Sequence, residues 1–405
     1  MAERLVIVGA GQAGFALAAK LRALKDDRPM TILGAEPVLP YQRPPLSKKY
    51  LLGEMSFDRL LFRQEAWYAE NDIEIRLSTP VEAIDREKRV VPLFDGSEIS
   101  YGTLALATGA TPRRLPGAIG GGLEGVYTVR DKADADRLAE EMKPGHRLLI
   151  VGGGYIGLEA AAVARKLGLD VTLIEMADRI LARVAAPETA AAIRAIHASE
   201  GVSIHERTGL TRLIADEGRV KAAELSDGRV IDTDLVIVGI GVTPNDRLAA
   251  DAGLDVQNGI VVDSFGRTSD PAIFAMGDCA VQAWNGQQVR LESVQNAVDQ
   301  AEAIAGVIAG GSEPYRPKPW FWSDQYDVKL QIAGFNLGYD KTVLRPGGRE
   351  GSLSVWYFRE GQFIAVDAIN DAKAYVTGKK LLDLGRSVDP LAIADPALDL
   401  KSLLA

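Results

Sequence analysis

Two stretches of this sequence decide its fold. Residues 4–22 read RLVIVGAGQAGFALAAKLR, and residues 147–168 read RLLIVGGGYIGLEAAAVARKLG. In each, a short apolar run typical of a buried parallel strand precedes G-x-G-x-x-G, and an alanine-rich helical pattern follows it. This order predicts a strand, a tight glycine turn and a helix whose N-terminus binds a pyrophosphate. The expected fold class is α/β, with two Rossmann-like dinucleotide-binding domains.

Acidic residues follow both motifs where a dinucleotide site needs them. Glu36 ends the segment MTILGAE and Glu175 ends DVTLIE, each about 20 residues past its motif, where a carboxylate binds a ribose diol. Two such sites predict one tightly bound FAD and one exchangeable nicotinamide cofactor; the alternative is that one copy is a degenerate structural remnant. The glycines expected to line the two phosphate turns are Gly9, Gly11 and Gly14 for FAD, and Gly152, Gly154 and Gly157 for the nicotinamide cofactor.

Glu175 also bears on which nicotinamide cofactor is used. A carboxylate at this place accepts hydrogen bonds from a free 2′-hydroxyl and repels a 2′-phosphate, so it favours NADH over NADPH. Arg179 and Arg183 follow closely and weaken this argument, since an arginine can receive a 2′-phosphate. We expect Arg183 to meet the pyrophosphate or to lie on the surface.

A second pair of segments also repeats. DGSEISYGTLALATGATPR begins at Asp95 and DGRVIDTDLVIVGIGVTPN begins at Asp227; each has a D-G hairpin signal, a buried apolar strand and G-x-T-P. One fold is therefore used twice. The first copy is longer, and PYQRPPLSKKYLLG, residues 40–53, accounts for much of the surplus. The expected domains are an FAD-binding domain from residues 1–110 and 244–318, an NAD-binding domain from 111–243, and a small C-terminal α+β domain from 319–405.

Bulk properties narrow the class of protein. The chain has 405 residues and a net charge of −9, which disfavours nucleic-acid binding. The single cysteine, Cys279, rules out an intrachain disulfide and suits a reducing compartment. With no apolar run of the ~18 residues that a membrane span needs, a cytoplasmic protein is expected. His146, His197 and His205 stand in surface-like or helical contexts without metal-ligand spacing, and no metal site is predicted.

The sequence closely resembles the FAD-containing, NADH-linked ferredoxin reductases of bacterial oxygenase systems, of the putidaredoxin reductase and biphenyl dioxygenase reductase type, whose fold is glutathione-reductase-like. The similarity runs through almost the whole chain. It rests on GAGQAG, PYQRPPLSK, LALATGATPR, GGGYIGLE, GIGVTPN, IFAMGDC, ESVQNA and PWFWSDQ. RPPLSK and FWSDQ are the most specific of these segments, because the glycine motifs occur in many flavoproteins.

The resemblance implies roles for individual residues. Lys48 is expected near the flavin N5 and O4, where a fixed cation stabilises the reduced flavin. Tyr155 is expected over the flavin face, moving aside for nicotinamide, and Glu159 is expected to meet the nicotinamide carboxamide and to pair with Lys48. Further FAD contacts are implied for Ala13, Arg43, Val81, Thr108, Gly109, Arg130, Asp278, Val294, Gln295 and Trp322, with Trp320 beside the flavin edge. Further NAD contacts are implied for Ile156, Arg183 and Gly241.

The reaction implied is electron transfer from NADH through FAD, one electron at a time, to a [2Fe–2S] ferredoxin that serves a haem-thiolate monooxygenase or an aromatic-ring dioxygenase. Related disulfide reductases carry a redox cysteine close to the flavin, whereas residues 36–52 contain none. The alternatives are an NADH oxidase or peroxidase, or a reductase of the rubredoxin or nitrite-reductase type. Family members are often monomers or weak dimers. Candidate cations for docking an acidic ferredoxin are Arg290, Arg316, Lys318, Lys329, Lys379 and Lys380.

Overall fold

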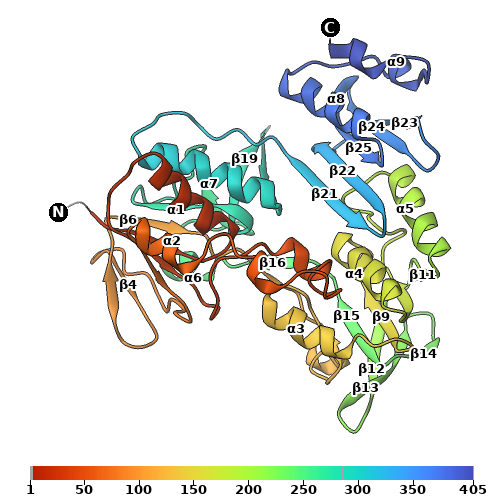
Figure 1. The fold of residues 1–405 in the computed structure, drawn as a ribbon, viewed down its shortest axis with the longest axis horizontal. Coiled ribbons are helices and arrows are strands. Elements are labelled where there is room, and N and C mark those ends of the chain that lie inside the picture. Colours follow the sequence, from red (N-terminus) through yellow and green to blue (C-terminus); the bar gives the residue numbers. More distant parts are fainter. Residues whose placement is uncertain (1–2, 285, 405) are drawn as a thin grey trace. The chain divides into compact units, whose positions relative to one another are not determined.

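The computed structural model describes residues 3–284 and 286–404. The chain forms two compact units (Figure 1). Unit 1 contains residues 1–42, 57–111 and 242–319, and unit 2 contains residues 43–56, 112–241 and 320–405. No helix within the described residues is long and apolar enough to cross a membrane.

Unit 1 is built on a parallel sheet of five strands in the order β18-β6-β1-β2-β3. Its central strand β1 (Leu5–Val8) is completely buried and pairs with both neighbours, Leu5 lying opposite Met30 and Thr103. Burying one such aliphatic side chain contributes about 1.5–3 kcal/mol, which is why the apolar run forms the centre of the sheet. The other strands of this sheet are β2 (Met30–Leu33), β3 (Ile73–Arg76), β6 (Thr103–Leu106) and β18 (Ile273–Ala275).

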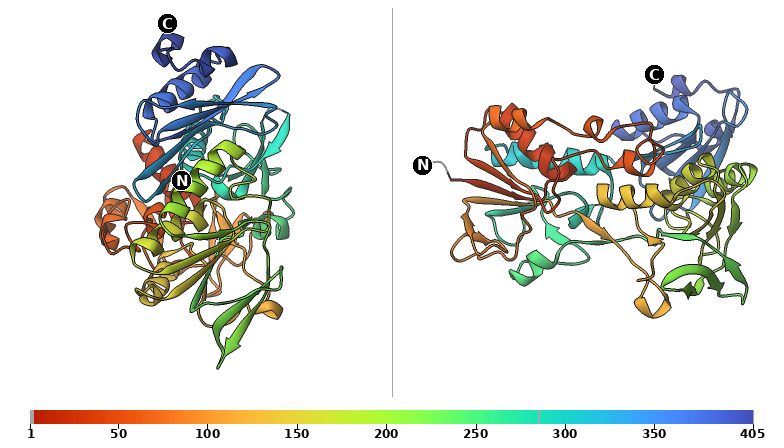
Figure 2. Two further views of the ribbon diagram at one scale, coloured as in Figure 1. Left: turned by 90° about the vertical axis from the view of Figure 1, so that its right-hand side faces the viewer. Right: turned by 60° about the horizontal axis from the view of Figure 1, so that its bottom comes forward.

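Helices α1 (Gln12–Ala23) and α7 (Val294–Ile308) lie side by side and share one apolar core with this sheet (Figure 1, Figure 2). The alanines of α1 permit this close packing, because a small side chain lets a helix approach the strands. The remaining elements are η2 (Phe57–Arg59), α2 (Glu65–Glu70), β4 (Val90–Pro92), β5 (Glu98–Ser100), α6 (Arg247–Asp251), β17 (Ile260–Val262), η4 (Gly277–Cys279), β19 (Ala280–Trp284) and β20 (Gln287–Val289). The two G-x-T-P segments form β7 (Ala110–Pro112) and β16 (Val242–Pro244), which make a two-stranded sheet.

Unit 2 repeats the same parallel arrangement in the order β11-β10-β9-β15-β8. Strand β9 (Arg147–Val151) occupies the place that β1 has in unit 1, and α4 (Tyr155–Lys166) follows its glycine turn as α1 follows the first. The predicted fold class, with one fold used twice, is confirmed. The other elements of this part are η1 (Pro44–Ser47), η3 (Gly117–Ile119), β8 (Val126–Tyr127), α3 (Lys132–Glu141), β10 (Asp170–Ile174), α5 (Pro187–Ser199), β11 (Ser203–His205), β12 (Leu210–Asp216), β13 (Arg219–Leu225), β14 (Val230–Asp232) and β15 (Leu235–Val238).

The C-terminal part of unit 2 is the expected α+β domain. An antiparallel sheet in the order β21-β22-β25-β24-β23 is packed against α8 (Ala372–Asp383), drawn in blue in Figure 1. Its strands are β21 (Trp320–Gln325), β22 (Val328–Gly334), β23 (Lys341–Pro346), β24 (Leu353–Arg359) and β25 (Gln362–Ile369), and α9 (Pro390–Ala394) and η5 (Leu400–Leu404) follow. Strand β21 contacts α4, so the C-terminal sheet meets the helix that follows the second glycine turn.

Candidate functional site

The first glycine turn in unit 1 has the geometry that a phosphate requires. Gly9 has a φ of +118°, and a Cβ there would stand 2.1 Å from the carbonyl oxygen of Ala107. A Cβ on Gly14 would meet the Gly9 carbonyl oxygen at 2.0 Å, whereas a Cβ on Gly11 would face open space. No side chain caps the N-terminus of α1, so its first backbone N–H groups can bind an anion. The turn therefore fits the pyrophosphate of FAD.

Around this turn, unit 1 gathers other residues predicted to contact FAD. Glu36 lies three residues after the end of β2, and its carboxylate accepts a hydrogen bond of 2.7 Å from the Tyr41 hydroxyl. Thr108 donates to the backbone oxygen of Asn245 at 2.6 Å, and the Asn245 amide donates to the Thr108 oxygen at 2.8 Å. These two bonds fasten the two G-x-T-P segments together.

A second set of predicted FAD residues lies at η4 and at the start of α7. Gly277 has a φ of +75°, and a Cβ there would stand 3.2 Å from that of Ala13, so the turn before Asp278 packs closely on α1. Ser293 caps α7 by accepting the backbone N–H of Asn296 at 3.1 Å, which places the predicted Val294 and Gln295 in the first helical turn. Val81 pairs with Leu93 in an isolated bridge, and Gly109 has a φ of +69°.

The second glycine turn reproduces the first. Gly152 has a φ of +109°, and a Cβ there would lie 2.4 Å from the carbonyl oxygen of Gly239, while a Cβ on Gly157 would lie 2.2 Å from the oxygen of Gly152. Gly154 faces open space, and α4, like α1, begins without a side-chain cap. Ile156 in its first turn is exposed. The geometry fits a second dinucleotide and disfavours a degenerate remnant.

The Glu175 carboxylate is fixed at the end of β10. One oxygen accepts the backbone N–H of Gly153 at 2.7 Å and the other accepts that of Ala177 at 2.8 Å. Arg179 donates to the carbonyl oxygens of Ala185 at 2.7 Å and Ile180 at 3.2 Å, so its guanidinium is engaged within the fold. The structure therefore weakens the argument for a 2′-phosphate at this position.

Near the same turn, Gly241 has a φ of +94°, and a Cβ there would stand 3.6 Å from Nη2 of Arg183. The predicted Gly241 and Arg183 are thus brought together. Elsewhere in unit 2, Arg43 donates to the backbone oxygen of Arg130 at 2.9 Å, which joins two residues predicted to contact FAD.

Glu159 forms an ion pair and two side-chain hydrogen bonds inside unit 2. It lies one turn into α4, its side chain is 5% exposed, and it forms an ion pair of 2.9 Å with Lys48, which follows η1. Ser323 on β21 donates to the same oxygen at 2.7 Å, and Ser47 donates to the other oxygen at 3.1 Å. A buried carboxylate is costly unless it is paired and hydrogen-bonded, and here three side chains from two other segments supply the donors.

Aromatic side chains lie beside this carboxylate. The ring of Tyr155 is 4.7 Å from that of Phe321, and the rings of Trp320 and Trp322 are 5.4 Å apart. The Tyr155 hydroxyl is buried without a hydrogen-bond partner among the described residues, and burial raises its pKa well above the usual value. Its hydroxyl is turned into the protein, so the predicted movement over a flavin stays a prediction.

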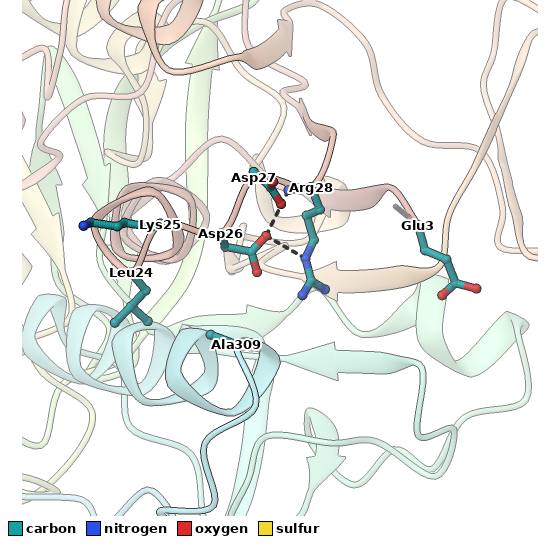
Figure 3. Close-up of a pocket in the computed structure, with 7 residues that line it drawn as sticks. All are labelled: Glu3, Leu24, Lys25, Asp26, Asp27, Arg28 and Ala309. Atoms are coloured by element: carbon teal, nitrogen blue, oxygen red, sulfur yellow. Dashed lines mark hydrogen bonds and ion pairs between the residues drawn. The ribbon is translucent and has the colours of Figure 1, made fainter. Parts of the chain in front are cut away.

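A hollow of about 500 Å³ in unit 1 lies away from these residues. It is lined by the segment that follows the C-terminus of α1, the end opposite to the glycine turn, together with Glu3 and Ala309 (Figure 3). Asp26 and Arg28 form an ion pair of 2.8 Å on its wall. No predicted site residue lines it. Within the described residues, no group of three or more His, Cys, Asp and Glu side chains could hold a metal ion.

Residues 3–301 match the family model described as pyridine nucleotide-disulphide oxidoreductase, and residues 320–404 match the model described as reductase C-terminal. The chain belongs to the pyridine nucleotide-disulphide oxidoreductase family. It is an oxidoreductase, and the FAD and NADH predicted from the two glycine turns are confirmed as its cofactors.

Relatives and solved structures agree with this assignment. The chain is 45% identical to a ferredoxin–NAD(P)+ reductase of a Sphingomonas species, over 99% of this chain and 97% of that one. It is 43% identical to the ferredoxin reductase subunit of a 5,5′-dehydrodivanillate O-demethylase from a Sphingobium species, over 99% and 98%. It superposes with a TM-score of 0.96 on a structure of a covalent putidaredoxin reductase–putidaredoxin complex, at 38% identity and over 99% and 98% of the two chains.

Sequence reasoning missed part of the site. Ser47 and Ser323 stand inside the quoted segments PYQRPPLSK and PWFWSDQ, but neither was expected to bind Glu159. His197 was expected in a surface-like or helical context; it is helical, but it is completely buried in α5. Arg290 was a docking candidate, yet its side chain is only 9% exposed and pairs with Glu292 at 2.6 Å, so it is not available to a partner.

Proposed function

We propose that this protein takes two electrons from NADH and delivers them through FAD, one at a time, to a [2Fe–2S] ferredoxin that serves an oxygenase. The observation that carries the proposal is the buried Lys48–Glu159 ion pair one helical turn from the second glycine turn. The pair supplies charge at the nicotinamide end of a dinucleotide whose pyrophosphate binds at that turn. Because the only cysteine, Cys279, is completely buried, a thiol is not the carrier that hands electrons on.

Each part of the chain contributes a defined interaction. The N-terminus of α4 binds the NADH pyrophosphate, with Arg183 and Gly241 beside it, and Glu175 accepts hydrogen bonds from the adenosine ribose. Glu159 accepts a hydrogen bond from the nicotinamide carboxamide, while Lys48 pairs with the buried carboxylate and orients it. Orientation of the reacting ring is worth several kcal/mol of the barrier. Bound FAD supplies the chemistry of accepting a hydride and releasing single electrons.

In unit 1, the first glycine turn binds the FAD pyrophosphate, and Glu36 accepts hydrogen bonds from the adenosine ribose. The roles of Arg43, Lys48, Arg130 and Trp322 toward FAD stay predictions. For the ferredoxin, the remaining basic candidates are Arg316, Lys318, Lys329, Lys379 and Lys380. Charges of this kind guide an acidic partner and raise the association rate more than the affinity.

The deciding experiment is NADH-dependent cytochrome c reduction by the purified flavoprotein, with and without added [2Fe–2S] ferredoxins. A large and saturable dependence on one ferredoxin is the expected result, and it identifies the partner. Equal consumption of NADH without any ferredoxin, with oxygen as the electron acceptor, would show that the protein is an oxidase.

A further inference from the structure

A line of buried hydrogen bonds leads from Glu159 across unit 2. Ser323 Oγ donates to Glu159 Oε1 at 2.7 Å, and Gln325 Nε2 donates to Ser323 Oγ at 3.1 Å. Gln325 Oε1 lies 2.8 Å from Nε2 of His197, and the Tyr326 hydroxyl lies 3.2 Å from the other ring nitrogen, Nδ1. The line connects α4 with β21 and with α5, two elements that are far apart in the sequence.

The charge of Glu159 fixes the direction of every bond in this line. An ionised carboxylate only accepts, so the Ser323 hydroxyl donates to it and its oxygen is left to accept from the Gln325 amide nitrogen. The Gln325 amide oxygen then faces His197 and can only accept, so the His197 proton is on Nε2. In the neutral ring Nδ1 is an acceptor, and Tyr326 donates to it. All four bonds thus point their protons toward Glu159.

Because these side chains are buried, their hydrogen-bond partners come from the protein itself. Ser323, Gln325 and His197 are at most 1% exposed, so water does not replace a missing partner, and losing one donor leaves a buried polar group unsatisfied. Burial also lowers the pKa of His197 below its usual value, which keeps the ring neutral near pH 7. Burial raises the pKa of Tyr326 above its usual value, so this phenol keeps the proton that it donates.

We propose that Ser323, Gln325 and His197 are positioning residues for the reaction with NADH: their aligned hydrogen bonds hold the Glu159 carboxylate against Lys48 in one orientation. The inference rests on the proposed function, because it takes Glu159 to be the group that meets the nicotinamide. Ser323 binds Glu159 directly, and Gln325 and His197 are connected to it through Ser323, so all three act through Glu159. Aligned hydrogen bonds polarise one another in a low-dielectric interior, and the influence of each residue decreases with its distance along the line.

The test is anaerobic stopped-flow reduction of the FAD-loaded enzyme by NADH, which gives a limiting rate and a half-saturating NADH concentration. The limiting rate should fall about 10-fold in Ser323→Ala, about 5-fold in Gln325→Met, about 3-fold in His197→Phe and less than about 2-fold in Tyr326→Phe. The half-saturating NADH concentration should change less than about 2-fold, because the adenosine end binds elsewhere. Thr233→Val is the matched control, since Thr233 is a buried hydroxyl of the same unit that donates to backbone oxygens.

Two outcomes would overturn the proposal that Ser323, Gln325 and His197 position the Glu159 carboxylate. One is a set of variants whose limiting rates all stay within twofold of the parent enzyme and of Thr233→Val. The other is a loss that follows each variant's melting temperature instead of its position in the line. Glu159→Gln separates the proposed role of Glu159 from the proposed positioning role of Ser323, Gln325 and His197. If Glu159→Gln slows flavin reduction while Ser323→Ala and Gln325→Met do not, only the positioning role is wrong. If Glu159→Gln also leaves reduction unchanged, the role assigned to Glu159 is wrong, and the positioning role of Ser323, Gln325 and His197 is refuted with it. The transfer of electrons to a ferredoxin is tested by the separate cytochrome c assay.

Discussion

Replacing Lys48 by methionine should lower both the free energy of unfolding and the rate of flavin reduction by NADH. Methionine keeps the length of the side chain but removes the charge 2.9 Å from Glu159, whose side chain is only 5% exposed. Breaking a buried pair by removing one partner costs about 3–5 kcal/mol. The Lys48 side chain is 17% exposed, and two hydroxyl groups continue to donate to the carboxylate, so we expect a cost at or just below the lower end of that range, about 2–3 kcal/mol.

The assay is a double-mutant cycle by urea unfolding of the FAD-loaded enzyme, with Glu159→Gln as the second change. Glutamine carries no charge, so the double variant leaves no uncompensated ion, and its destabilisation should be smaller than the sum of the single changes by at least about 1.5 kcal/mol. Lys49→Ala is the matched control, since Lys49 is the exposed neighbour of Lys48; it should change stability by less than about 0.5 kcal/mol.

The same variants report on the reaction. Lys48→Met should lower the limiting rate of flavin reduction by NADH about 10–100-fold, which is about 1.4–2.8 kcal/mol of transition-state stabilisation. Lys49→Ala should leave the rate unchanged. A coupling energy below about 0.5 kcal/mol would refute the argument that the pair is buried and mutually dependent. An unchanged reduction rate in Lys48→Met would refute its role in the reaction even if the coupling is found.

Three further outcomes follow from other residues. Glu175→Ala should lower the ratio of kcat/KM for NADH over NADPH about 10-fold or more, because the carboxylate no longer repels a 2′-phosphate; an unaltered ratio would contradict the cofactor argument. Gly9→Ala should give colourless protein without FAD, because its Cβ would stand 2.1 Å from a backbone oxygen, whereas Gly96→Ala, where a Cβ meets open space, should stay yellow. Asp367 is completely buried, which raises its pKa to about 6, above the ~3.9 of an unfolded chain. The folded protein therefore holds a proton there between about pH 4 and pH 6, and this group's contribution to stability falls as pH rises through that window. Asp367→Asn should raise the free energy of unfolding at pH 7 by about 1–3 kcal/mol relative to the parent and by less at pH 4; an equal effect at both pH values would show that the carboxyl does not titrate there.

The sequence predicted those parts of the protein that depend on local spacing. The glycine turns, the acidic residues at Glu36 and Glu175 and the repeated G-x-T-P segments each depend on residues close together in the chain, so the strands β1 and β9 and the helices that follow them could be located from the motifs. The pairing of Lys48 with Glu159 came from family resemblance, because nothing in the spacing of these residues relates a proline-rich insertion to a helix in the second copy.

The donors around Glu159 could not be found in this way. A serine in a strand and a glutamine two residues later, as at Ser323 and Gln325, are ordinary residues on a sheet surface until α5 and α4 cover them. The burial of His197 could not be predicted for the same reason: its ring contacts Gln325, the last residue of β21, and Tyr326 in the following turn, both far away in the sequence. Side chains that act through tertiary hydrogen bonds leave no periodic signal.

The segment of residues 43–56, which contains most of the insertion at residues 40–53, makes the two copies of the fold unlike. It interrupts the first copy of the fold in the sequence, yet it folds with unit 2, where Ser47 and Lys48 bind Glu159 on α4. Lys48, which belongs to the first copy in the sequence, thus pairs with Glu159 of the second copy, and the two glycine turns have different surroundings. The two prolines of η1 restrict its backbone, and this restriction helps to hold the Lys48 ammonium beside Glu159.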